Sequence, residues 1–465
     1  MNIHASTGSL QDKLDTVPSI VDYLYANQKG SPARDAVLRQ PPPRVQPEYT
    51  SWRDEQRAWR EGVAFYNQSF HMISTVVRGK DAKALFQSLA VNNLEKFGVG
   101  KARHYIACGH DGNVVGDGIL TCQAKNEIEL IGRAAGHKWL EFNALNGNWD
   151  VELECDDIFS LNPNQRRRFY RYQVEGPNAA SLLEKLNGAA LPDVPRTTIV
   201  GMTIAGHKVW GFRMAMAGGP GYEIWGAWDE GEDVKAAILG AGPEFGLRQV
   251  GSFAYYSTAL ELGWIARPMH AIYTSEEMRP FREWLPASSN EVRWALGGSL
   301  YSPNIEDYYF NPYELGYGHL VKFDHDFVGR AALERIAGKK HRRRVTLIWD
   351  AKDVTDIVGG YMAPGETPPL YLNMPVSTYA TWQYDAVRSA DGTTVGAAVY
   401  SGFSWNERKQ VSVAVIDADH AEPGTRLSLL WGEPDGGAKS HPWLEPHRQV
   451  SVGVTVAPAP INTLA

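Results

Sequence analysis

The phrases Val77-Arg-Gly-Lys-Asp-Ala82 and Val174-Glu-Gly-Pro-Asn-Ala179 share one pattern, in which a strand ends in a turn and a helix follows. Glycine permits the turn because it has no Cβ atom. Asp81 and Asn178 stand where a side chain is suited to cap the helix that follows. The recurrence of this pattern indicates two similarly built lobes.

The residue patterns around these phrases extend the interpretation. The runs Ile73–Val77 and Glu127–Ile131 are rich in β-branched and apolar residues and are typical of strands. The windows Asp81–Leu89 and Asn178–Leu186 are helical in character. Strands that alternate with helices in this way predict an α+β fold, with a mixed or antiparallel sheet.

After Arg344 the pattern changes to strands separated by turn residues, which is typical of a β-barrel. The expected strands are Val345–Trp349, Val395–Tyr400, Val411–Ile416 and Leu427–Leu430. At the other end, residues 1–48 are polar and contain Gln40-Pro-Pro-Pro43, which favours an extended arm over a core element. We therefore expect an arm at 1–48, the two-lobed region at 49–344 and a barrel domain at 345–465.

The charge balance limits the partners of the protein. With 46 basic and 53 acidic residues the chain has a formal charge of -7, so no general attraction to nucleic acid or anionic membranes is expected. No run of about 18 apolar residues is present, and three cysteines cannot form a disulfide framework. The first residues include acids where a signal peptide needs an apolar core, which favours a cytoplasmic protein. The basic runs Arg166–Arg168 and Lys339–Arg344 are expected on a solvated face or at a domain seam.

Cys108-Gly-His110 resembles half of a Rieske iron–sulfur site, which needs a second cysteine and histidine. Cys122 is followed by Gln-Ala-Lys125, so the second half is missing, and a turn beside Gly112 is the better interpretation. The chain also lacks the H-E-x-x-H, C-x-x-C, P-loop and G-x-S-x-G motifs. Metallohydrolase, NTPase and serine hydrolase functions therefore have no support, and no metal is expected.

Polar side chains at strand ends and turns are the remaining candidates for a site. Arg133 follows the strand Glu127–Ile131 and precedes a helical stretch, where a guanidinium can face a ligand and bind a carboxylate with two nitrogens. Glu223 begins a strand after the glycine-rich turn Gly218-Gly-Pro-Gly221. The residues alone are also compatible with a surface ion pair at Arg133 and an ordinary turn at Glu223.

Four further side chains belong to short phrases of this kind. Tyr255 and Tyr256 lie in residues 250–257, which we interpret as a turn, and tyrosines in such places commonly serve in packing. Gln68 and His71 are three residues apart and could share one helical face. None of these four residues indicates a function by itself.

Taken in order, these phrases resemble those of the tetrahydrofolate-dependent aryl O-demethylases. This group acts on vanillate, syringate and dicamba and belongs with the glycine-cleavage aminomethyltransferases. The resemblance covers about residues 48–458, and so many phrases in one order are not a chance match. The shared phrases are Trp52-Arg-x-Glu-Gln56, Gln68-x-x-His71, Val174-x-Gly-Pro-Asn-Ala179, Gly221-Tyr-Glu-Ile-Trp-Gly226, Val250-Gly-Ser252, Leu260-Glu-Leu-Gly-Trp264, Asn311-Pro-Tyr-Glu-Leu-Gly-Tyr-Gly318, Val321-Lys-Phe-Asp-His-Asp-Phe-Val-Gly-Arg330 and Ser401-Gly402.

The resemblance implies a three-domain cloverleaf fold around a central hole, in which residues 49–344 bind tetrahydrofolate. It also implies methyl transfer from a methoxybenzoate to the folate N5 atom. Glu223 would accept hydrogen bonds from the pterin ring, and Trp264 would line the folate site. Tyr255 matches the catalytic tyrosine, which protonates the ether oxygen. The residues that match the pocket of the aromatic acid are Gln68, His71 and, for the carboxylate, Arg133.

Two departures from the family pattern bear on the substrate. Aminomethyltransferases have two adjacent acids after a glycine-rich turn, whereas Val115-Gly-Asp117-Gly118 keeps one, which leaves Asp117 as a folate neighbour or a turn aspartate. Vanillate-type enzymes carry a Tyr-Pro step where this chain has Pro42-Pro43. A chlorinated ring such as that of dicamba is therefore expected to react at least as well as vanillate or syringate, while Arg133 still requires the carboxylate.

Two alternatives remain open at this point. An aminomethyltransferase or sulfonium demethylase of the same fold would act on an aliphatic donor, to which the set of Gln68, His71, Arg133 and Tyr255 is less suited than to an aromatic acid. A folate-binding regulatory protein would not need a proton donor at Tyr255. The sequence does not indicate an oligomeric state.

Overall fold

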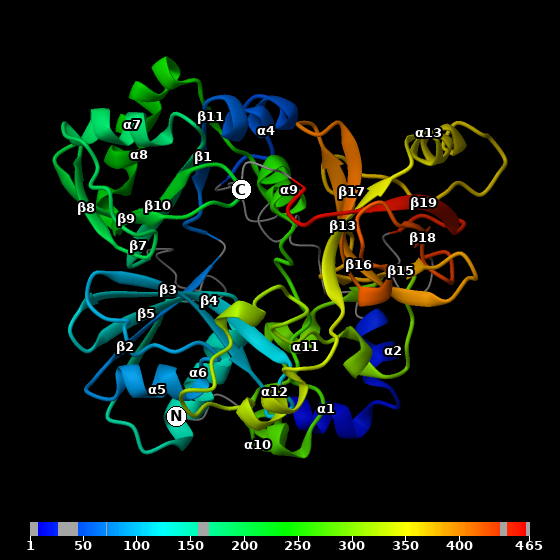
Figure 1. Ribbon diagram of the computed structural model, residues 1–465, viewed down its shortest axis with the longest axis horizontal. Coiled ribbons are helices and arrows are strands. Elements are labelled where there is room, and N and C mark those ends of the chain that lie inside the picture. Colours follow the sequence, from blue (N-terminus) through cyan, green and yellow to red (C-terminus); the bar gives the residue numbers. More distant parts are fainter. Residues whose placement is uncertain (1–7, 27–44, 71, 157–166, 438–443, 462–465) are drawn as a thin grey trace.

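The computed structural model describes residues 8–26, 45–70, 72–156, 167–437 and 444–461. It contains two large β-sheets with their helices and one β-barrel, which Figure 1 shows as three lobes around the middle of the molecule. The α+β fold with a C-terminal barrel that the sequence predicts is confirmed. None of the helices in these ranges is long and apolar enough to cross a membrane.

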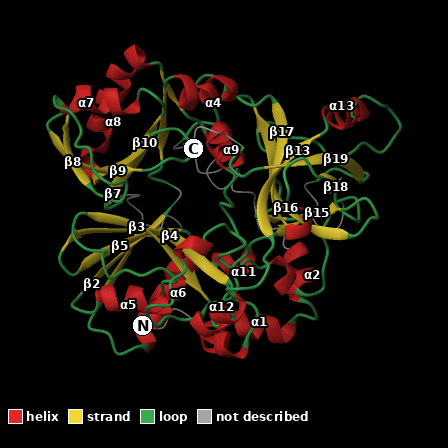
Figure 2. Ribbon diagram, in the orientation of Figure 1, coloured by secondary structure: helices red, strands yellow, loops and turns green. Residues whose placement is uncertain are grey.

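The first lobe is built on a six-stranded sheet with the order β11-β1-β7-β10-β9-β8. β1 runs parallel to β11 and the other neighbours are antiparallel, so the sheet is mixed. Helices α7 (Ala179–Asn187) and α8 (Gly231–Ala241) lie beside this sheet (Figure 2). Their apolar side chains share one core with those of the strands. The strands are β1 (Val63–Asn67), β7 (Phe169–Glu175), β8 (Val200–Ile204), β9 (His207–Arg213), β10 (Gly221–Ala227) and β11 (Leu247–Gln249).

The second lobe is built on a five-stranded antiparallel sheet with the order β3-β4-β5-β2-β6. Helices α5 (Ala82–Leu89) and α6 (Ala134–Asn146) share its apolar core. The four elements predicted in the two lobes are confirmed to within one residue at each end. The strands are β2 (Ile73–Arg78), β3 (Lys101–Cys108), β4 (Val114–Ala124), β5 (Glu127–Gly132) and β6 (Glu152–Asp156).

The repeated strand–turn–helix phrase has the same conformation in both lobes. Gly79 follows β2 with a φ of 136°, and Gly176 follows β7 with a φ of 131°. A Cβ atom at Gly79 would lie 2.1 Å from the carbonyl oxygen of Asp150, and one at Gly176 would lie 2.4 Å from that of Gly62. Only glycine fits these turns, so the repeated phrase corresponds to the same local strand–turn–helix structure in both lobes.

The expected helix caps, however, are wrong in detail. Asp81 and Asn178 occupy the N-cap positions of α5 and α7, but neither side chain accepts a capping hydrogen bond. Asp81 instead accepts a hydrogen bond from the backbone N–H of Asp150 at 2.9 Å, and Asn178 donates to the carbonyl oxygen of Phe245 at 3.2 Å. Both side chains therefore connect the start of their helix to a segment distant in sequence, at Asp150 and Phe245 respectively.

The third lobe is a closed barrel with the strand order β13-β17-β16-β15-β18-β19. β13 pairs with both β17 and β19, which closes the ring, and apolar side chains fill its interior. All four predicted strands of this region are present, and the first begins at Arg343. The strands are β13 (Arg343–Trp349), β15 (Asp385–Arg388), β16 (Thr394–Ser404), β17 (Lys409–Ile416), β18 (Arg426–Trp431) and β19 (Val450–Ala457).

The N-terminal segment departs from the expected arm. Residues 10–25 form α1 (Leu10–Thr16) and α2 (Ile20–Tyr25), in which Leu10, Val21 and Leu24 are completely buried in the core of the second lobe. These few apolar residues suffice to dock both helices, so this part of residues 1–48 is a core element and the arm prediction is wrong there. Gln40–Pro43 lie outside the described residues.

Further short elements connect the three lobes. α4 leads into β1, and α9 follows β11 and lies between the six-stranded sheet and the barrel (Figure 1). Two short strands, β12 and β14, form a small parallel pair. These elements are α4 (Trp52–Glu61), α9 (Ser252–Leu262), α10 (Arg279–Trp284), α11 (Asn290–Arg293), α12 (Arg330–Ile336), α13 (Ala351–Gly360), β12 (Leu296–Gly297) and β14 (Trp382–Gln383).

Candidate active site

The proton donor suggested by the sequence lies on a helix. α9 begins after Gly251 and carries Tyr255 and Tyr256, so the turn expected over residues 250–257 is wrong. Gly251 only begins the helix, and no further glycine or proline interrupts it. The ring centroid of Tyr255 lies 5.9 Å from that of Tyr66 on β1 and 5.5 Å from that of Tyr256.

Helix α4 fixes the position of α9. Glu55 is fully buried, and its Oε2 accepts a hydrogen bond from the backbone N–H of Gly251 at 2.8 Å. Its Oε1 accepts from two further backbone N–H groups. Gln56 donates from Nε2 to Oγ of Ser257 at 2.7 Å. These two residues, which come from one of the phrases shared with the O-demethylases, therefore hold the helix that carries Tyr255.

The surroundings of Tyr255 keep its phenol protonated. Burial raises the pKa of Tyr255, and the neighbouring Tyr256 raises it further. The positive charges of Arg133 and Arg267 lower the pKa of Tyr255 and oppose this shift. A phenol that keeps its proton under the influence of two cations can donate that proton to an oxygen that becomes negative.

Arg133 stands at the N-cap position of α6, directly after β5, where the sequence placed it. Its side chain is half-buried and forms no hydrogen bond or ion pair with any residue that the structure describes. Burial lowers the pKa of the Arg133 guanidinium to about 10, and the charge of Arg267 contributes to the decrease. An arginine withdrawn from water without an ion-pair partner favours an anionic ligand.

A charged cluster joins the two sheets at Glu223. Glu223, on β10, is 2% exposed, and its Oε1 accepts a hydrogen bond from Nη1 of Arg171 at 3.1 Å. Arg171, on β7, also places Nη2 2.7 Å from Oε1 of Glu129, on β5 of the other sheet. Burial raises the pKa of the Glu223 carboxyl, and the charge of Arg171 opposes that shift. Oε2 of Glu223 has no hydrogen-bond partner within the described part of the chain, so it can accept a bond from a ligand.

Gln68 lines a pocket beside this cluster, together with Glu129 and Arg171. It follows β1 in an irregular segment, so the helical face proposed for Gln68 and His71 is wrong. The backbone N–H of Gln68 donates to the carbonyl oxygen of Arg171 at 2.9 Å, which extends the strand pairing instead of starting a helix. The side chain is 1% exposed, and its Oε1 has no hydrogen-bond partner among the described residues. His71 lies outside those residues.

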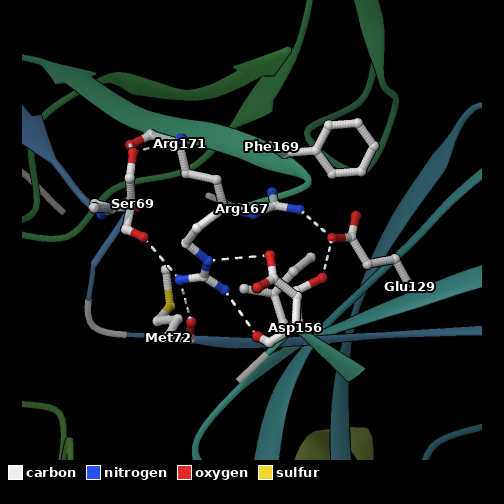
Figure 3. Close-up of a pocket in the computed structure, with 10 residues that line it drawn as sticks. Ser69, Met72, Glu129, Asp156, Arg167, Phe169 and Arg171 are labelled. Atoms are coloured by element: carbon white, nitrogen blue, oxygen red, sulfur yellow. Dashed lines mark hydrogen bonds and ion pairs between the residues drawn. The ribbon is translucent and has the colours of Figure 1, made fainter. Parts of the chain in front are cut away.

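Arg167 fastens the same pocket across the seam between the sheets (Figure 3). Its Nε donates to Oδ2 of Asp156 at 3.1 Å, and its Nη1 donates to the carbonyl oxygens of Ser69 and Met72 at 2.7 and 2.8 Å. The expectation that the basic run at 166–168 lies at a domain seam is confirmed for Arg167. Arg166 lies outside the described residues.

Asp117 lies within β4, so its interpretation as a turn aspartate is wrong. Gly116 and Gly118 on either side are strand residues that allow close approach, since a Cβ atom at Gly118 would lie 2.4 Å from the carbonyl oxygen of Ile131. Oδ2 of Asp117 lies 3.0 Å from Nε2 of His104 on β3. The contact of Asp117 with folate stays a prediction.

Trp264 follows the end of α9 and is half-buried. Its Nε1 is buried without a hydrogen-bond partner, and among the described residues it forms no ring contact with the other predicted site residues. Its place beside folate also stays a prediction. By contrast, the charges of Arg133 and Glu223 both act on Tyr255: Arg133 lowers the pKa of its phenol and Glu223 raises it.

Three charged residues of the site were not singled out from the sequence. Glu129 and Arg171 each interrupt an apolar strand, and a charge inside such a strand is a signal that could have found them. Arg267 lies in an irregular segment after α9, where no local pattern distinguishes it.

The half-site at Cys108 is an ordinary turn. Cys108 ends β3, and His110 lies in the turn that continues to Gly112, which has a φ of 83°. The turn predicted there is confirmed. Within the described ranges, no group of three or more His, Cys, Asp and Glu side chains is arranged to hold a metal ion.

Comparison with known proteins places these features in one family. The family of the GCVT N-terminal domain matches residues 34–276, more than half of the chain. The chain is 39% identical to the syringate O-demethylase of a Sphingobium species over 98% of this chain and 96% of that one. It is 29% identical to the sesamin methylene transferase of a Sinomonas species over 83% of this chain and 86% of that one.

A solved structure is similar in fold. The glycine cleavage system aminomethyltransferase T from Bartonella henselae superposes with a TM-score of 0.58 at 16% identity, over 88% of this chain and 89% of that one. The cloverleaf fold implied by the shared phrases is thereby confirmed. The chain belongs to the GCVT family of aminomethyltransferase-like proteins.

Proposed function

We propose that this protein is a tetrahydrofolate-dependent O-demethylase, which moves the methyl group of a methoxybenzoate to N5 of tetrahydrofolate and releases a phenol. The proposal is carried by Tyr255, a half-buried phenol that keeps its proton under the charges of Arg133 and Arg267, which form no ion pair with any described residue. Similarity to a syringate O-demethylase over nearly the whole chain supports a donor of the same class.

An aromatic acid that carries a methyl ether needs a partner for its carboxylate and a polar group beside its ring, and the proposed donor site offers both. Arg133 binds the carboxylate through two nitrogens, which fixes the ring relative to Tyr255. Gln68 offers a buried amide whose Oε1 has no hydrogen-bond partner among the described residues. His71 is assigned to the same pocket by its place in the shared phrase.

The residues beside Glu223 fit tetrahydrofolate. The pterin ring presents amino and ring N–H donors, and Glu223 is a buried residue whose Oε2 has no hydrogen-bond partner in the described ranges. Gln173 on β7 is the direct cross-strand partner of Glu223, so the two side chains share one face of the sheet. Oε1 of Gln173 is also buried, and no described residue forms a hydrogen bond with it. Two acceptors on one face therefore match a ring with several donors.

The chemistry requires a methyl carrier and a proton donor. When bound, tetrahydrofolate supplies the N5 nucleophile that takes the methyl group. As the bond between methyl carbon and ether oxygen breaks, Tyr255 donates its proton to that oxygen, so the product leaves as a phenol. Arg133 and Arg267 stabilise the tyrosinate that this step leaves. The proton released from nitrogen on methylation restores Tyr255.

Incubation of the purified protein with tetrahydrofolate and a donor panel tests the proposal. The panel contains dicamba, vanillate and syringate, with a sulfonium compound and an aminomethyl donor as aliphatic controls. We expect 5-methyltetrahydrofolate and the corresponding phenol in equal amounts from at least one aromatic acid, detected by mass spectrometry. Product from an aliphatic donor and from none of the aromatic acids would replace the proposal with the aliphatic alternative.

A further inference from the structure

A second arginine lies beside Arg133. Arg267 is half-buried in the segment after α9, and its guanidinium carbon lies 5.3 Å from the centroid of the Tyr256 ring. Its Nε is buried and has no hydrogen-bond partner, and no carboxylate of a described residue forms an ion pair with it. The segment of Arg267 lies beside β4, because the backbone N–H of Ala271 donates to the carbonyl oxygen of Val114 at 3.1 Å, and β4 pairs with β5, which ends directly before Arg133. The charge of Arg267 also lowers the pKa of Arg133 and of Tyr255.

Comparison with two other arginines of low exposure shows what Arg267 lacks. Arg171 lies between the carboxylates of Glu129 and Glu223. Arg60 likewise pairs with two carboxylates. Removing a guanidinium from water is costly unless an opposite charge and hydrogen bonds compensate. At Arg133 and Arg267, two such groups come together without that compensation from the described residues.

The aromatic ring next to Arg267 does not satisfy it. A cation over an aromatic ring gains about 0.5–2 kcal/mol. The five N–H groups of a guanidinium, however, point outward in its own plane, and a ring below that plane accepts no hydrogen bond from them. Two neighbouring guanidinium groups also repel each other. A single anion between them removes both deficits, because a carboxylate has about four acceptor positions and can bind two arginines at once.

We propose that Arg267 is a second anion-binding residue of the donor site, which shares with Arg133 the carboxylate of the aromatic donor. The inference rests on the proposed function only for the identity of the methyl donor. The binding of an aryl carboxylate by Arg267 does not depend on methyl transfer. The site therefore selects monoanionic aryl acids strongly over neutral rings of the same shape. Arg267 sets this selectivity together with Arg133.

The test measures binding without methyl transfer. Calorimetry in the absence of folate compares 3,4,5-trimethoxybenzoate with the neutral 3,4,5-trimethoxybenzamide. Arg267→Gln should weaken binding of the acid by about 10- to 100-fold, the range for a lost charged hydrogen bond, and change binding of the amide by less than about 3-fold. Arg133→Gln should show the same contrast.

A matched control separates charge recognition from a general effect of removing an arginine. Arg388, on barrel strand β15, is also half-buried, and its buried Nε has no hydrogen-bond partner in the part of the chain that the structure describes. Arg388→Gln should leave the acid affinity unchanged. Circular dichroism verifies that each variant is folded.

Three outcomes would overturn the inference. These are unchanged acid affinity in Arg267→Gln, an equal loss for acid and amide, and failure of the acid to bind the unaltered protein. A protein that binds the acid through Arg267 but never methylates tetrahydrofolate would refute the proposed function and leave this inference standing.

Discussion

Replacing Tyr255 by phenylalanine should abolish most turnover while leaving the fold and donor binding intact. The phenylalanine ring keeps the contacts with Tyr66 and Tyr256 at 5.9 and 5.5 Å and loses only the hydroxyl group. The leaving oxygen then departs as a phenoxide, and loss of a general acid lowers rates by about 10²–10⁴. Because the charges of Arg133 and Arg267 remain to stabilise that phenoxide, we expect the lower part of this range. The expected loss is about 10²–10³ in kcat, or about 3–4 kcal/mol in the activation free energy.

Single-turnover formation of 5-methyltetrahydrofolate under saturating donor measures this loss without interference from product release. Tyr256→Phe is the matched control, since it removes a phenol from the next position of the same helix, and its kcat should stay within about 3-fold of normal. Because burial raises the pKa of Tyr255, the unaltered protein should not lose activity through this group between about pH 7 and 9. Near-normal turnover in Tyr255→Phe, with a large loss in Tyr256→Phe, would refute the assignment.

Four further predictions concern the folate site, the support of α9, the barrel and the ring specificity. Glu223→Ala should weaken tetrahydrofolate binding by about 10- to 100-fold in calorimetry, with the affinity for the aromatic acid unchanged, because it removes a buried charged acceptor. Gln56→Ala should lower the free energy of unfolding in urea by about 1–3 kcal/mol and reduce kcat, because it removes the hydrogen bond from α4 to Ser257 on α9. An unchanged kcat would show that this contact does not support catalysis. Burial raises the pKa of Asp385 to about 7 from an ordinary 3.8, so the protonated carboxyl stabilises the fold below about pH 4, and this contribution is lost as the pH rises to 7. The free energy of unfolding should therefore fall by on the order of 4 kcal/mol over this range, and Asp385→Asn should not show the fall. Dicamba should show a kcat/KM at least equal to that of vanillate or syringate and anisole none, and a clear preference for vanillate or syringate would show that Pro42-Pro43 does not set ring specificity.

The elements of the fold could be predicted because local sequence determines them. A turn that only glycine can make follows both β2 and β7, and the sequence shows it as a repeated phrase. The barrel strands were recognised from runs of β-forming residues between turns, such as Val411–Ile416 within β17. Some local predictions are wrong because the same residue type serves in more than one local structure. Asp81 resembles a cap but accepts a bond from a distant backbone, and Gly251 resembles the middle of a turn but begins α9.

The site itself could be predicted only in part, because its chemistry arises from the docking of lobes. Arg171 and Glu129 belong to different sheets, and each is a costly buried charge until the sheets meet. The local sequence shows that a charged residue interrupts an apolar strand. The oppositely charged residue that compensates its burial is determined by how the two sheets pack. The same reasoning applies in reverse to Arg133 and Arg267, which come together on packing without a carboxylate from the described residues. Docking of the two sheets thus gives Arg171 its carboxylate partners, whereas the anion that we propose for Arg133 and Arg267 comes from the ligand.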